Sequence, residues 1–429
     1  MYFPVTTISN LTSNNEWYTA YNGVNFYYQE NRYGTNFSSN DFEYSSVILK
    51  DAENGDTRPE DLIEFSYNEL CFAVDYFYGR PGREVLHDSL AEYGLEKSLQ
   101  NLGAAGEKII ELLHSGSYAE YFAGISRLQI FLENGGHTAV ENISNSRVLY
   151  SKLNEQYEAV NSGLDSLFEE YSANTEKKEL SEDMRIARMA QREEILNCGD
   201  STYVKRGDTA ICILDGFGVK IYDVWKDYYE GKTEKPTLEN LAEGLKPDPV
   251  LKVTDAIKRA SADPEVKNLI VDISNNGGGD TDECTAVIAL LTGSRLVTTY
   301  AKNMYTGVVA KLVTEVDCNL DGVFDEKDNI DHGLNIGVLT SSYSYSCGTL
   351  FPMYMKELGY PTLGEQSGGG ACCIETLSSA EGFVYQLSSG VIAYSDSTGT
   401  VYDAGMPVDI SLYLRNEDYS VKEITLTVP

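Results

Sequence analysis

From about residue 203 onward, short apolar runs alternate with segments of helical character, and this alternation restricts the folds that the chain can adopt. The runs include "TAICIL", "KNLIVDIS", "NIGVLTS" and "YPTLGE". Each has the length of a single strand, and the segments between them are long enough to be helices. Strands that alternate with helices are typical of a sheet covered by helices. The sequence therefore predicts an α/β core over residues 201–429.

The chain before residue 200 shows other patterns. Residues 1–60 are rich in Tyr, Asn and Ser and contain alternating runs such as "GVNFYYQE", which predict a small β-rich segment. Over residues 61–145, apolar residues recur every three or four positions, which predicts a helical domain that ends at the element "GGHT". Residues 146–200 resemble a pair of charged amphipathic helices, joined by the polar stretch "SANTEKKELSED". We therefore expect three N-terminal regions before the core.

The charge of the chain excludes several classes of partner. It has 66 acidic and 33 basic residues, a formal net charge of −33. Such a surface repels nucleic acid and anionic membranes. No apolar run is long enough to span a bilayer, so no transmembrane segment is predicted. The acidic composition suits solubility outside a cell or the attraction of cations, and we expect a bacterial-type extracytoplasmic protein. Because "MYFPVTTISN" lacks the features of a signal peptide, we expect a signal or anchor to lie outside this sequence.

The eight cysteines form no CxxC pair, and two of them, Cys372 and Cys373, are adjacent. This spacing matches neither a zinc site nor a disulfide framework, and it predicts mostly buried free thiols.

A glycine-rich turn follows the predicted strand 268–273. The sequence there is "VDISNNGGGDTDE", in which three consecutive glycines allow a sharp turn and leave backbone N–H groups unshielded. No Gly-Lys-Ser/Thr follows, so the turn is not a phosphate-binding P-loop. Two interpretations remain, an oxyanion hole and a simple tight turn.

Hydroxyl side chains cluster where the predicted strand "NIGVLT" gives way to a helix, in "TSSYSYSCGTLF". These hydroxyls could cap the helix, because Ser and Thr accept hydrogen bonds from its first N–H groups. Alternatively, one of them is a nucleophile beside backbone donors. Ser346, directly before Cys347 and Gly348, is the best candidate, and Ser342 and Ser344 are its competitors.

A serine nucleophile needs a base, which is most often histidine. The chain has four histidines, His87, His114, His137 and His332. His137 lies between a Gly pair and the strand-like "TAV", where a side chain can be directed toward a site. The pattern therefore favours His137 as the base.

Three segments in this order resemble the core signature of the C-terminal-processing (tail-specific) serine peptidase family, which includes the tricorn core protease. They are "VDISNNGGG", "LTSSYSYSCGTLFPMYMKELGYPTLGEQSGGG" and "DAGMPVDI". The resemblance covers about residues 203–415 and extends back to "GGHT", which is similar to the family's histidine element. It implies a crotonase/ClpP-like fold for the core and a serine peptidase acting on peptides or proteins, as an endopeptidase or at carboxyl termini.

The family has a branch with a lysine base and a tricorn-like branch with a histidine base. No lysine occurs between Lys356 and Lys422, so the lysine branch is excluded. The tricorn-like branch implies Ser346 as nucleophile, His137 as base and Asp403, in "YDAGMPVD", as the acid that orients the imidazole. It also implies an oxyanion hole formed by the N–H groups of Gly278 and Cys347. Two departures are Gly136 in place of a serine and Asp403 in place of a glutamate.

A further motif, "DCNLDGVFDEKD" at residues 317–328, has the spacing of a calcium-binding loop. Such a loop has oxygen ligands at positions 1, 3, 5, 9 and 12, a carbonyl ligand at position 7 and a glycine at position 6. The corresponding residues are Asp317, Asn319, Asp321, Asp325 and Asp328, with the Val323 carbonyl and Gly322. The motif predicts one structural Ca²⁺, and the alternative is an acidic surface loop.

The sequence as a whole predicts a serine peptidase with a calcium-stabilised α/β core. The alternative function is a catalytically inactive, calcium-stabilised peptide-binding or cell-surface protein on the same scaffold, which the two departures from the tricorn pattern make reasonable. The oligomeric state is left open.

Overall fold

The computed structural model of the chain describes most residues between 57 and 423, together with a few short stretches before them. The described residues are 7–8, 11, 17–21, 26–30, 57–79, 85–133, 136–140, 151–171, 173–199, 201–218, 221–380, 384–412, 414–415 and 421–423. The chain divides into two compact units, residues 1–180 with 372–391 and residues 181–371 with 392–429. The domain boundaries expected near residues 60, 145 and 200 remain predictions.

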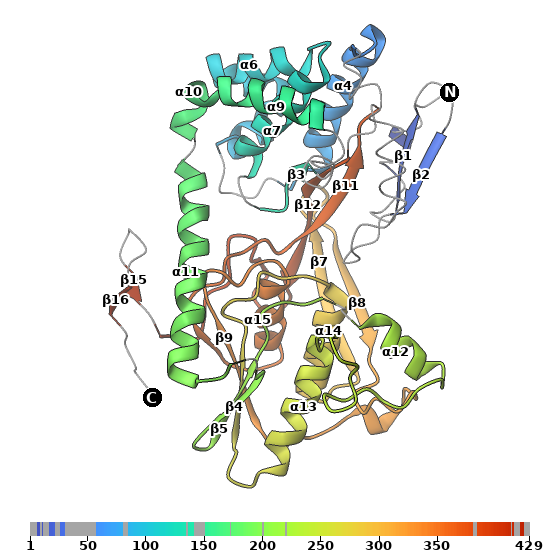
Figure 1. Ribbon diagram of the computed structural model, residues 1–429, viewed down its shortest axis with the longest axis vertical. Coiled ribbons are helices and arrows are strands. Elements are labelled where there is room, and N and C mark those ends of the chain that lie inside the picture. Colours follow the sequence, from blue (N-terminus) through green and yellow to red (C-terminus); the bar gives the residue numbers. More distant parts are fainter. Residues whose placement is uncertain are drawn as a thin grey trace. The chain divides into compact units, whose positions relative to one another are not determined.

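The second unit is built on a six-stranded sheet in the order β14-β10-β9-β6-β5-β4 (Figure 1). The strands are β4 (Tyr203–Arg206), β5 (Thr209–Ile213), β6 (Asn268–Asp272), β9 (Asn335–Thr340), β10 (Thr362–Gly364) and β14 (Ile410–Ser411). Neighbouring strands from β5 to β14 are parallel, and only β4 is antiparallel to its neighbour. The four apolar runs of the core are therefore strands of one sheet, and the predicted α/β fold class is confirmed.

Three helices lie in the crossover connections between successive strands of this sheet. They are α13 (Pro249–Ala262), α14 (Thr281–Thr292) and α15 (Cys347–Glu357), and α12 (Tyr222–Tyr229) lies in the connection before α13. The starts of α13 and α14 are capped by Asp248 and Asp280, whose carboxylates accept the N–H groups of Leu251 and Glu283. Because the carboxyl ends of parallel strands share one edge of a sheet, the turns after β6 and β9 meet at that edge.

A long hairpin, β7 (Leu296–Asn303) and β8 (Val309–Glu315), follows α14. The sequence analysis had not identified it, because its alternation of apolar with charged residues is irregular. Further along, β12 (Val384–Ser395) pairs with β13 (Thr400–Val401) in an antiparallel arrangement.

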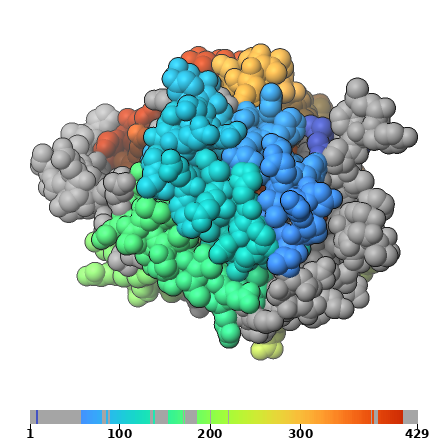
Figure 2. All heavy atoms as spheres, turned by 90° about the horizontal axis from the view of Figure 1, so that it is seen from above, coloured from blue at the N-terminus to red at the C-terminus, as the bar shows by residue number. Residues whose placement is uncertain are grey.

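The first unit is mainly helical. It contains α4 (Glu60–Phe77), α5 (His87–Asn101), α6 (Ala104–Leu113), α7 (Tyr118–Glu133), α9 (Ser151–Gly163), α10 (Asp165–Phe168) and the 3-10 turn η1 (Glu169–Tyr171). Figure 2 shows several of these helices, in blue to green, gathered next to one another. The unit also holds the hairpin β1 (Trp17–Tyr21) and β2 (Phe26–Glu30), the strand β11 (Cys372–Ser378) and β3 (Ala139–Val140), which pairs with β12.

In the second unit, the short strands β15 (Leu414–Arg415) and β16 (Val421–Glu423) pair near the end of the chain.

Two details of the helical region differ from the sequence analysis. Helix α6 was not predicted as a separate helix. In addition, residues 173–183 of the polar stretch expected to join two helices lie inside a single helix, α11 (Ala173–Leu196). This stretch contains no Pro or Gly, and its Glu, Lys and Leu residues favour helix, so polarity alone does not interrupt it. No helix in the described part of the chain is long and apolar enough to cross a membrane.

The end of α14 provides a test of the core. Gly293 ends this helix with φ of +60°, and a Cβ at this position would lie 1.7 Å from the Ile330 carbonyl oxygen. An alanine in the left-handed backbone conformation is unfavourable by itself. We expect Gly293→Ala to lower the free energy of unfolding by about 1–3 kcal/mol in addition to that cost, because the new Cβ would clash with the carbonyl oxygen. Gly333→Ala is the matched control, because Gly333 has φ of +65° with nothing within 4 Å of a Cβ. Equal losses for both variants in urea unfolding would contradict the close approach.

Candidate active site

Ser346 occupies the turn between the loop that follows β9 and the first residue of α15. Its backbone has φ of +55° and ψ of −122°, a conformation that residues with a Cβ rarely adopt. The Ser346 N–H donates to the Gly369 carbonyl at 2.8 Å, and its own carbonyl accepts the N–H of Thr349 at 2.7 Å. The Ser346 hydroxyl makes no capping hydrogen bond to the helix. Of the two interpretations of this junction, helix capping by Ser346 is therefore wrong.

The competing serines have different surroundings. Ser344 is fully buried; its hydroxyl donates to the Ile273 carbonyl at 2.8 Å and accepts the Ser341 N–H at 3.0 Å. Its hydroxyl therefore ties the loop to the end of β6. Ser342 is exposed, and its N–H faces the Glu365 carboxylate at 3.4 Å. Ser346 is half-buried, between these two extremes.

The glycine-rich turn lies directly against Ser346. Gly278 has φ of +107°, and a Cβ there would lie 2.5 Å from the Ser346 Cβ and 3.0 Å from the Cys347 nitrogen. The next residue, Gly279, is equally restricted, because a Cβ would lie 1.5 Å from the Phe217 carbonyl oxygen. Three residues predicted for the site, Ser346, Cys347 and Gly278, are therefore brought together.

Hydrogen bonds hold the glycine turn to the loop before α15. The Asn276 carbonyl accepts the Tyr345 N–H at 3.1 Å, and the Asn276 amide group donates to the Leu214 carbonyl at 3.1 Å. The Gly278 N–H donates to the Asn276 side-chain oxygen at 2.8 Å. Cys347 is buried, and its thiol donates to the Gly279 carbonyl at 3.0 Å. The turn and the loop therefore form one hydrogen-bonded assembly.

A second glycine-rich loop, residues 368–370, packs on the other side of this assembly. Its Gly368 N–H donates to the Ser344 carbonyl at 2.7 Å, and its Gly369 N–H donates to the Thr349 hydroxyl at 3.0 Å. The Gly370 N–H donates to the main-chain carbonyl of Asp403 at 2.8 Å. The backbone of Asp403 therefore lies at this loop, close in the fold to the residues that support Ser346.

His137 belongs to the first unit, immediately before β3. Its carbonyl accepts a hydrogen bond from the Gln386 side chain at 2.6 Å, and the next residue, Thr138, accepts the Ser388 N–H at 3.2 Å. These bonds fix the histidine to β12. The His137 ring is buried, and its Nδ1 lies 3.5 Å from the thiol sulfur of Cys372.

Cys372 is a neighbour of His137 that the sequence analysis treated only as a buried thiol. The available signal was its position two residues after the "GGG" of residues 368–370. That signal was weak, because only the pairing of β3 with β12 places a histidine far earlier in the chain beside β11. The structure therefore adds a thiol to the surroundings of the proposed base.

Buried acids lie at the starts of α13, which precedes the glycine turn, and of α14, which follows it. Glu283 is in the first turn of α14, and its burial, reinforced by Asp248 and Asp280, raises its pKa to about 8. Burial also raises the pKa of Asp248 above its usual value. Because a raised pKa keeps a carboxyl group neutral, Glu283 is mostly protonated near neutral pH, and it adds little negative charge beside the turn.

The loop 317–328 carries oxygen donors of the kind that bind Ca²⁺. Gly322 at position 6 has φ of +83°, as the sharp turn requires, and Asp317 and Asp328 are both buried. Asp317 accepts the N–H groups of Asp321 and Gly322, and Asp328 accepts those of Asn319 and Asp325. Neither buried carboxylate forms an ion pair within the described part of the chain.

The side chains of this loop are not gathered around a single point. Among the described residues, no three carboxylate, imidazole or thiolate side chains are placed to hold one metal ion. Asp325 instead accepts the Lys327 N–H and pairs with the Lys327 ammonium at 3.1 Å. The donor chemistry and the loop turn fit Ca²⁺, and binding would require Asp325 to leave this pair.

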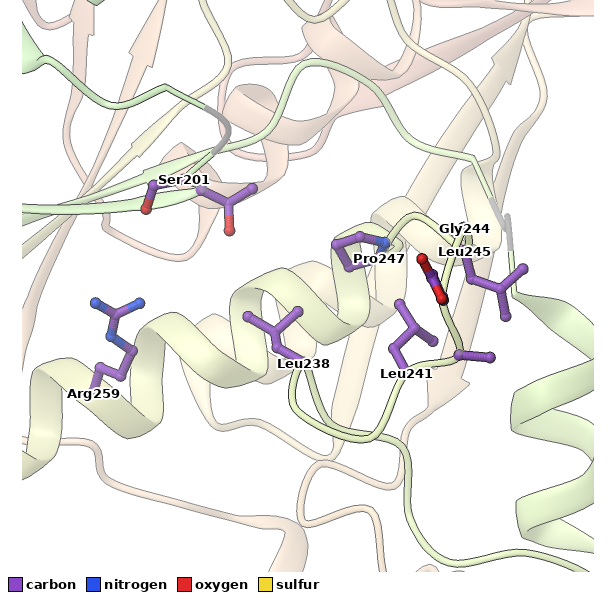
Figure 3. A pocket seen from close by; sticks show the side chains of 10 residues that line it. Ser201, Leu238, Leu241, Gly244, Leu245, Pro247 and Arg259 are labelled. Atoms are coloured by element: carbon purple, nitrogen blue, oxygen red, sulfur yellow. The ribbon is translucent and has the colours of Figure 1, made fainter.

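A surface cavity lies apart from these residues in the second unit (Figure 3). Its volume is about 380 Å³, and it is lined by Leu238, Leu241, Leu245, Pro247 and Arg259, among others. Arg259 already lies over the Tyr203 ring and pairs with Asp255. No residue predicted for catalysis or calcium binding lines this cavity.

Comparison with known proteins gives a family match for part of the chain. Residues 249–411 match the model of peptidase family S41. This segment contains Gly278, Ser346, Cys347 and Asp403 but not His137. No curated protein matches the chain.

The chain is also similar to several solved structures. They include a putative peptidase from Parabacteroides merdae (15% identity, 83% of this chain and 91% of that chain, TM-score 0.47). Mature CPAF shows 14% identity over 49% of this chain and 47% of that chain, with a TM-score of 0.33. The tricorn protease shows 16% identity over 52% of this chain and 16% of that chain, with a TM-score of 0.29. The chain thus spans about half the length of mature CPAF, and the family assignment depends on the family model alone.

Proposed function

We propose that this chain, whose residues 249–411 match the model of peptidase family S41, is a serine-type peptidase that hydrolyses peptide bonds with Ser346 as its nucleophile. The observation that carries the proposal is the conformation of Ser346 at the start of α15. A non-glycine residue with φ of +55° is strained, and such strain persists only where the surroundings impose it. Here the strained turn presents the serine beside the first N–H groups of a helix, as in other nucleophile turns.

In this proposal the Ser346 oxygen attacks the peptide carbonyl while His137 accepts the hydroxyl proton. A carbon–oxygen bond forms, and collapse of the tetrahedral intermediate breaks the carbon–nitrogen bond as His137 returns the proton to the leaving amine. Water then attacks the acyl-enzyme, His137 takes a proton from the water, and the proton passes back to the Ser346 oxygen as the acid product leaves. The reaction consumes one water molecule and requires no cofactor.

The N–H groups of Cys347 and Gly278 are the proposed donors to the oxyanion. Cys347 is the first residue of α15, where a helix leaves its N–H groups without intrahelical acceptors. The Gly278 N–H already donates to the Asn276 side chain at 2.8 Å. Its part in the oxyanion hole therefore requires that it exchange this bond for one to the developing negative charge. Such preorganised donors are usually the largest electrostatic contribution to acyl transfer.

The chain itself links the proposed base to the nucleophile. Gly369, which accepts the Ser346 N–H, precedes Cys372 by three residues, and Cys372 contacts His137. The resemblance to the tricorn-like branch adds Asp403 as the acid that orients the imidazole. The Cys372 thiol beside Nδ1 is a second group that can influence which ring nitrogen carries the proton.

The remaining parts of the proposal follow from the sequence. The substrate is a peptide or protein, cleaved internally or near its carboxyl terminus, and the core has a crotonase/ClpP-like arrangement. The net charge of −33 supports an extracytoplasmic setting and makes nucleic acid an unsuitable partner, whereas the bacterial source is proposed from the family resemblance alone. The competing function is a catalytically inactive peptide-binding or cell-surface protein.

The nucleophile assignment is tested with a fluorophosphonate probe, which reacts with activated serines. We expect wild-type protein to be labelled and Ser346→Ala to be unlabelled. Ser342→Ala should remain labelled, because this side chain is exposed and has no proposed role. Ser344→Ala should also be labelled where circular dichroism shows it to be folded, since its hydroxyl bonds to Ile273.

Two results would change the conclusion. Labelling that survives in Ser346→Ala but disappears in folded Ser344→Ala would reassign the nucleophile. Wild-type protein that binds peptides but is never labelled would favour the inactive binding protein.

The proposed base is tested by His137→Ala. A positioned general base contributes about 10²–10⁴-fold to the rate, so the rate of probe labelling should fall by that factor. His332→Ala is the control, because the His332 ring bonds to the Leu290 carbonyl at 2.7 Å and has no proposed role in catalysis. An unchanged labelling rate in His137→Ala would remove His137 from the mechanism.

We also propose that residues 317–328 bind one Ca²⁺ with a structural role. The ligands would be Asp317, Asn319, Asp321, Asp325 and Asp328 with the Val323 carbonyl. The buried carboxylates of Asp317 and Asp328 support this proposal, because a cation would offset the desolvation of their charges. The ion would hold the segment between α14 and β9 without entering the reaction.

The calcium proposal predicts a stability change. Binding only to the folded state should stabilise it by about 2.7 kcal/mol once free Ca²⁺ reaches one hundred times its dissociation constant. The measurement is a thermal melt with EDTA and with added Ca²⁺, on wild type and on Asp321→Ala. Mg²⁺ should substitute poorly, because it prefers a tighter octahedral shell. If the melting temperature of wild-type protein is the same with EDTA and with Ca²⁺, the calcium proposal is wrong and residues 317–328 are an ordinary acidic surface loop.

A further inference from the structure

Helix α11 places three arginines along one face. Arg185, Arg188 and Arg192 are three and four residues apart, a spacing that brings them to the same side of a helix. Arg185 lies over the Tyr343 ring, 5.5 Å from its centre. Arg192 forms a two-point contact with Asp215 at 2.8 and 2.6 Å. The charged helix has no part in the proposed reaction, yet this face contacts the loops that carry the site.

Arg188 is the central member of the row, and it reaches the start of the glycine turn. One of its guanidinium nitrogens donates to the Ser274 carbonyl at 3.2 Å. Ser274 is buried, and the turn of residues 275–279 begins directly after it. The same carbonyl also accepts the Ser341 hydroxyl, so it joins the two loops that meet at Gly278 and Ser346.

The other side of the Arg188 guanidinium contacts Glu365, the residue directly after β10. It lies 3.6 Å from the Glu365 carboxylate, and the two side chains are only 19% and 9% exposed. Glu365 faces the Ser342 N–H at 3.4 Å, and its own N–H donates to the Thr340 carbonyl at the end of β9. Through Glu365, Arg188 is therefore connected to residues 340–342.

Arg192 adds a second link to the same point. It lies 3.5 Å from the Asp272 carboxylate, which accepts the Ser274 N–H at 2.9 Å. The carbonyl of Ser274 is thus held by Arg188, and its N–H is held by an acid that pairs with Arg192. Asp215 and Asp272 together raise the pKa of Arg192 further above its usual value against the effect of burial, so its charge is secure.

The glycine turn and the nucleophile loop, which these arginines connect, cannot move far relative to each other. The backbone of Gly278 approaches Ser346 so closely that a single methyl group would not fit. A displacement of the turn relative to the loop would therefore change the position of Ser346 and the direction of the Cys347 N–H. Misplacement by about 1 Å can cost about 100-fold in rate.

We propose that Arg188 is a positioning residue of the peptidase site, which holds the glycine turn and the nucleophile loop in register through Ser274 and Glu365. This inference rests on the proposed function, since it assigns α11 a role in the same site. Arg188 touches neither substrate nor the reacting atoms. Its effect is to maintain the contact between Gly278 and Ser346.

The experiment uses Arg188→Gln, Arg188→Lys, Glu365→Gln and the double variant Arg188→Gln/Glu365→Gln in the full chain. For each, labelling by a fluorophosphonate probe gives the maximal rate and the half-saturating probe concentration. We expect Arg188→Gln to lower the maximal rate by about 10- to 100-fold, with little change in the half-saturating concentration. Arg188→Lys keeps the charge but not the forked geometry, so it should be intermediate. The double variant should lose less than the product of the two single losses.

A second measurement, amide hydrogen exchange, does not depend on activity. Arg188→Gln should increase exchange in residues 274–279 and 340–347 together, while the rest of the sheet stays protected. Arg295→Gln is the control, because Arg295 is 21% exposed and pairs with Glu315 and Glu326, away from both loops. It should change thermal stability without changing labelling or exchange at the site.

The outcomes are distinguishable. If folded Arg188→Gln exchanges its amide hydrogens in both segments as slowly as wild type, the inference is overturned. It is also overturned if the labelling rate of Arg188→Gln falls no further than that of Arg295→Gln. A higher half-saturating concentration with an unchanged maximal rate would also overturn it, because Arg188 would then contact the ligand. Wild-type protein that is not labelled would contradict the proposed function, and the exchange measurement would still decide the role of Arg188.

Discussion

The approach of the Gly278 backbone to Ser346 is the contact on which the rest of the second unit depends. It requires a residue without a Cβ at position 278 and a left-handed serine at position 346, and both are unfavourable for most sequences. Parallel strands β6 and β9 make the contact possible, because they are adjacent and end at the same edge. The hydrogen bonds of Asn276 and Ser344 then hold the two turns together. The strained backbone of Ser346 is therefore supported on both sides of the contact.

Charge is used in two ways in this acidic chain. Most carboxylates are on the surface, where they give the protein its large negative charge. A few basic groups are placed where acids are buried, as with Arg188 beside Glu365 and Arg192 beside Asp272. Removing one partner of such a pair leaves an uncompensated charge in a poorly solvated position, which is more costly than losing a surface pair. These pairs occur at the edge of the sheet that carries the candidate site.

The first unit contributes the proposed base on a separate framework. His137 is held by β12 through Gln386, and its ring faces the first residue of β11. Both strands follow the glycine loop that supports Ser346, so the chain passes from one framework to the other within a few residues. The thiol of Cys372 lies 3.5 Å from Nδ1 of His137. A group at this position bears on which ring nitrogen of His137 carries the proton.

Much of the α/β fold and part of the site could be predicted from the sequence. The strands β5, β6, β9 and β10 are short apolar runs, and such runs form strands because a parallel sheet buries both of its faces. The glycine turn and the serine before α15 were also recognised, since glycines and a strand-to-helix junction have local signatures. By contrast, the hairpin of β7 and β8, the separate helix α6 and the continuity of α11 have weak or misleading local patterns. Polarity alone does not end a helix that contains Glu, Lys and Leu residues and no Pro or Gly.

The sequence by itself determined the kind of chemistry that this protein can attempt, because motif order and residue type are local properties of the chain. It could not reveal that Ser344 is consumed by a hydrogen bond to Ile273, that His137 lies against Cys372, or that Arg188 reaches Ser274 and Glu365. The partners in these contacts are separated by 71, 235, 86 and 177 residues, respectively. Only the tertiary structure decides such contacts, because they depend on which strands become neighbours and on which face a helix packs.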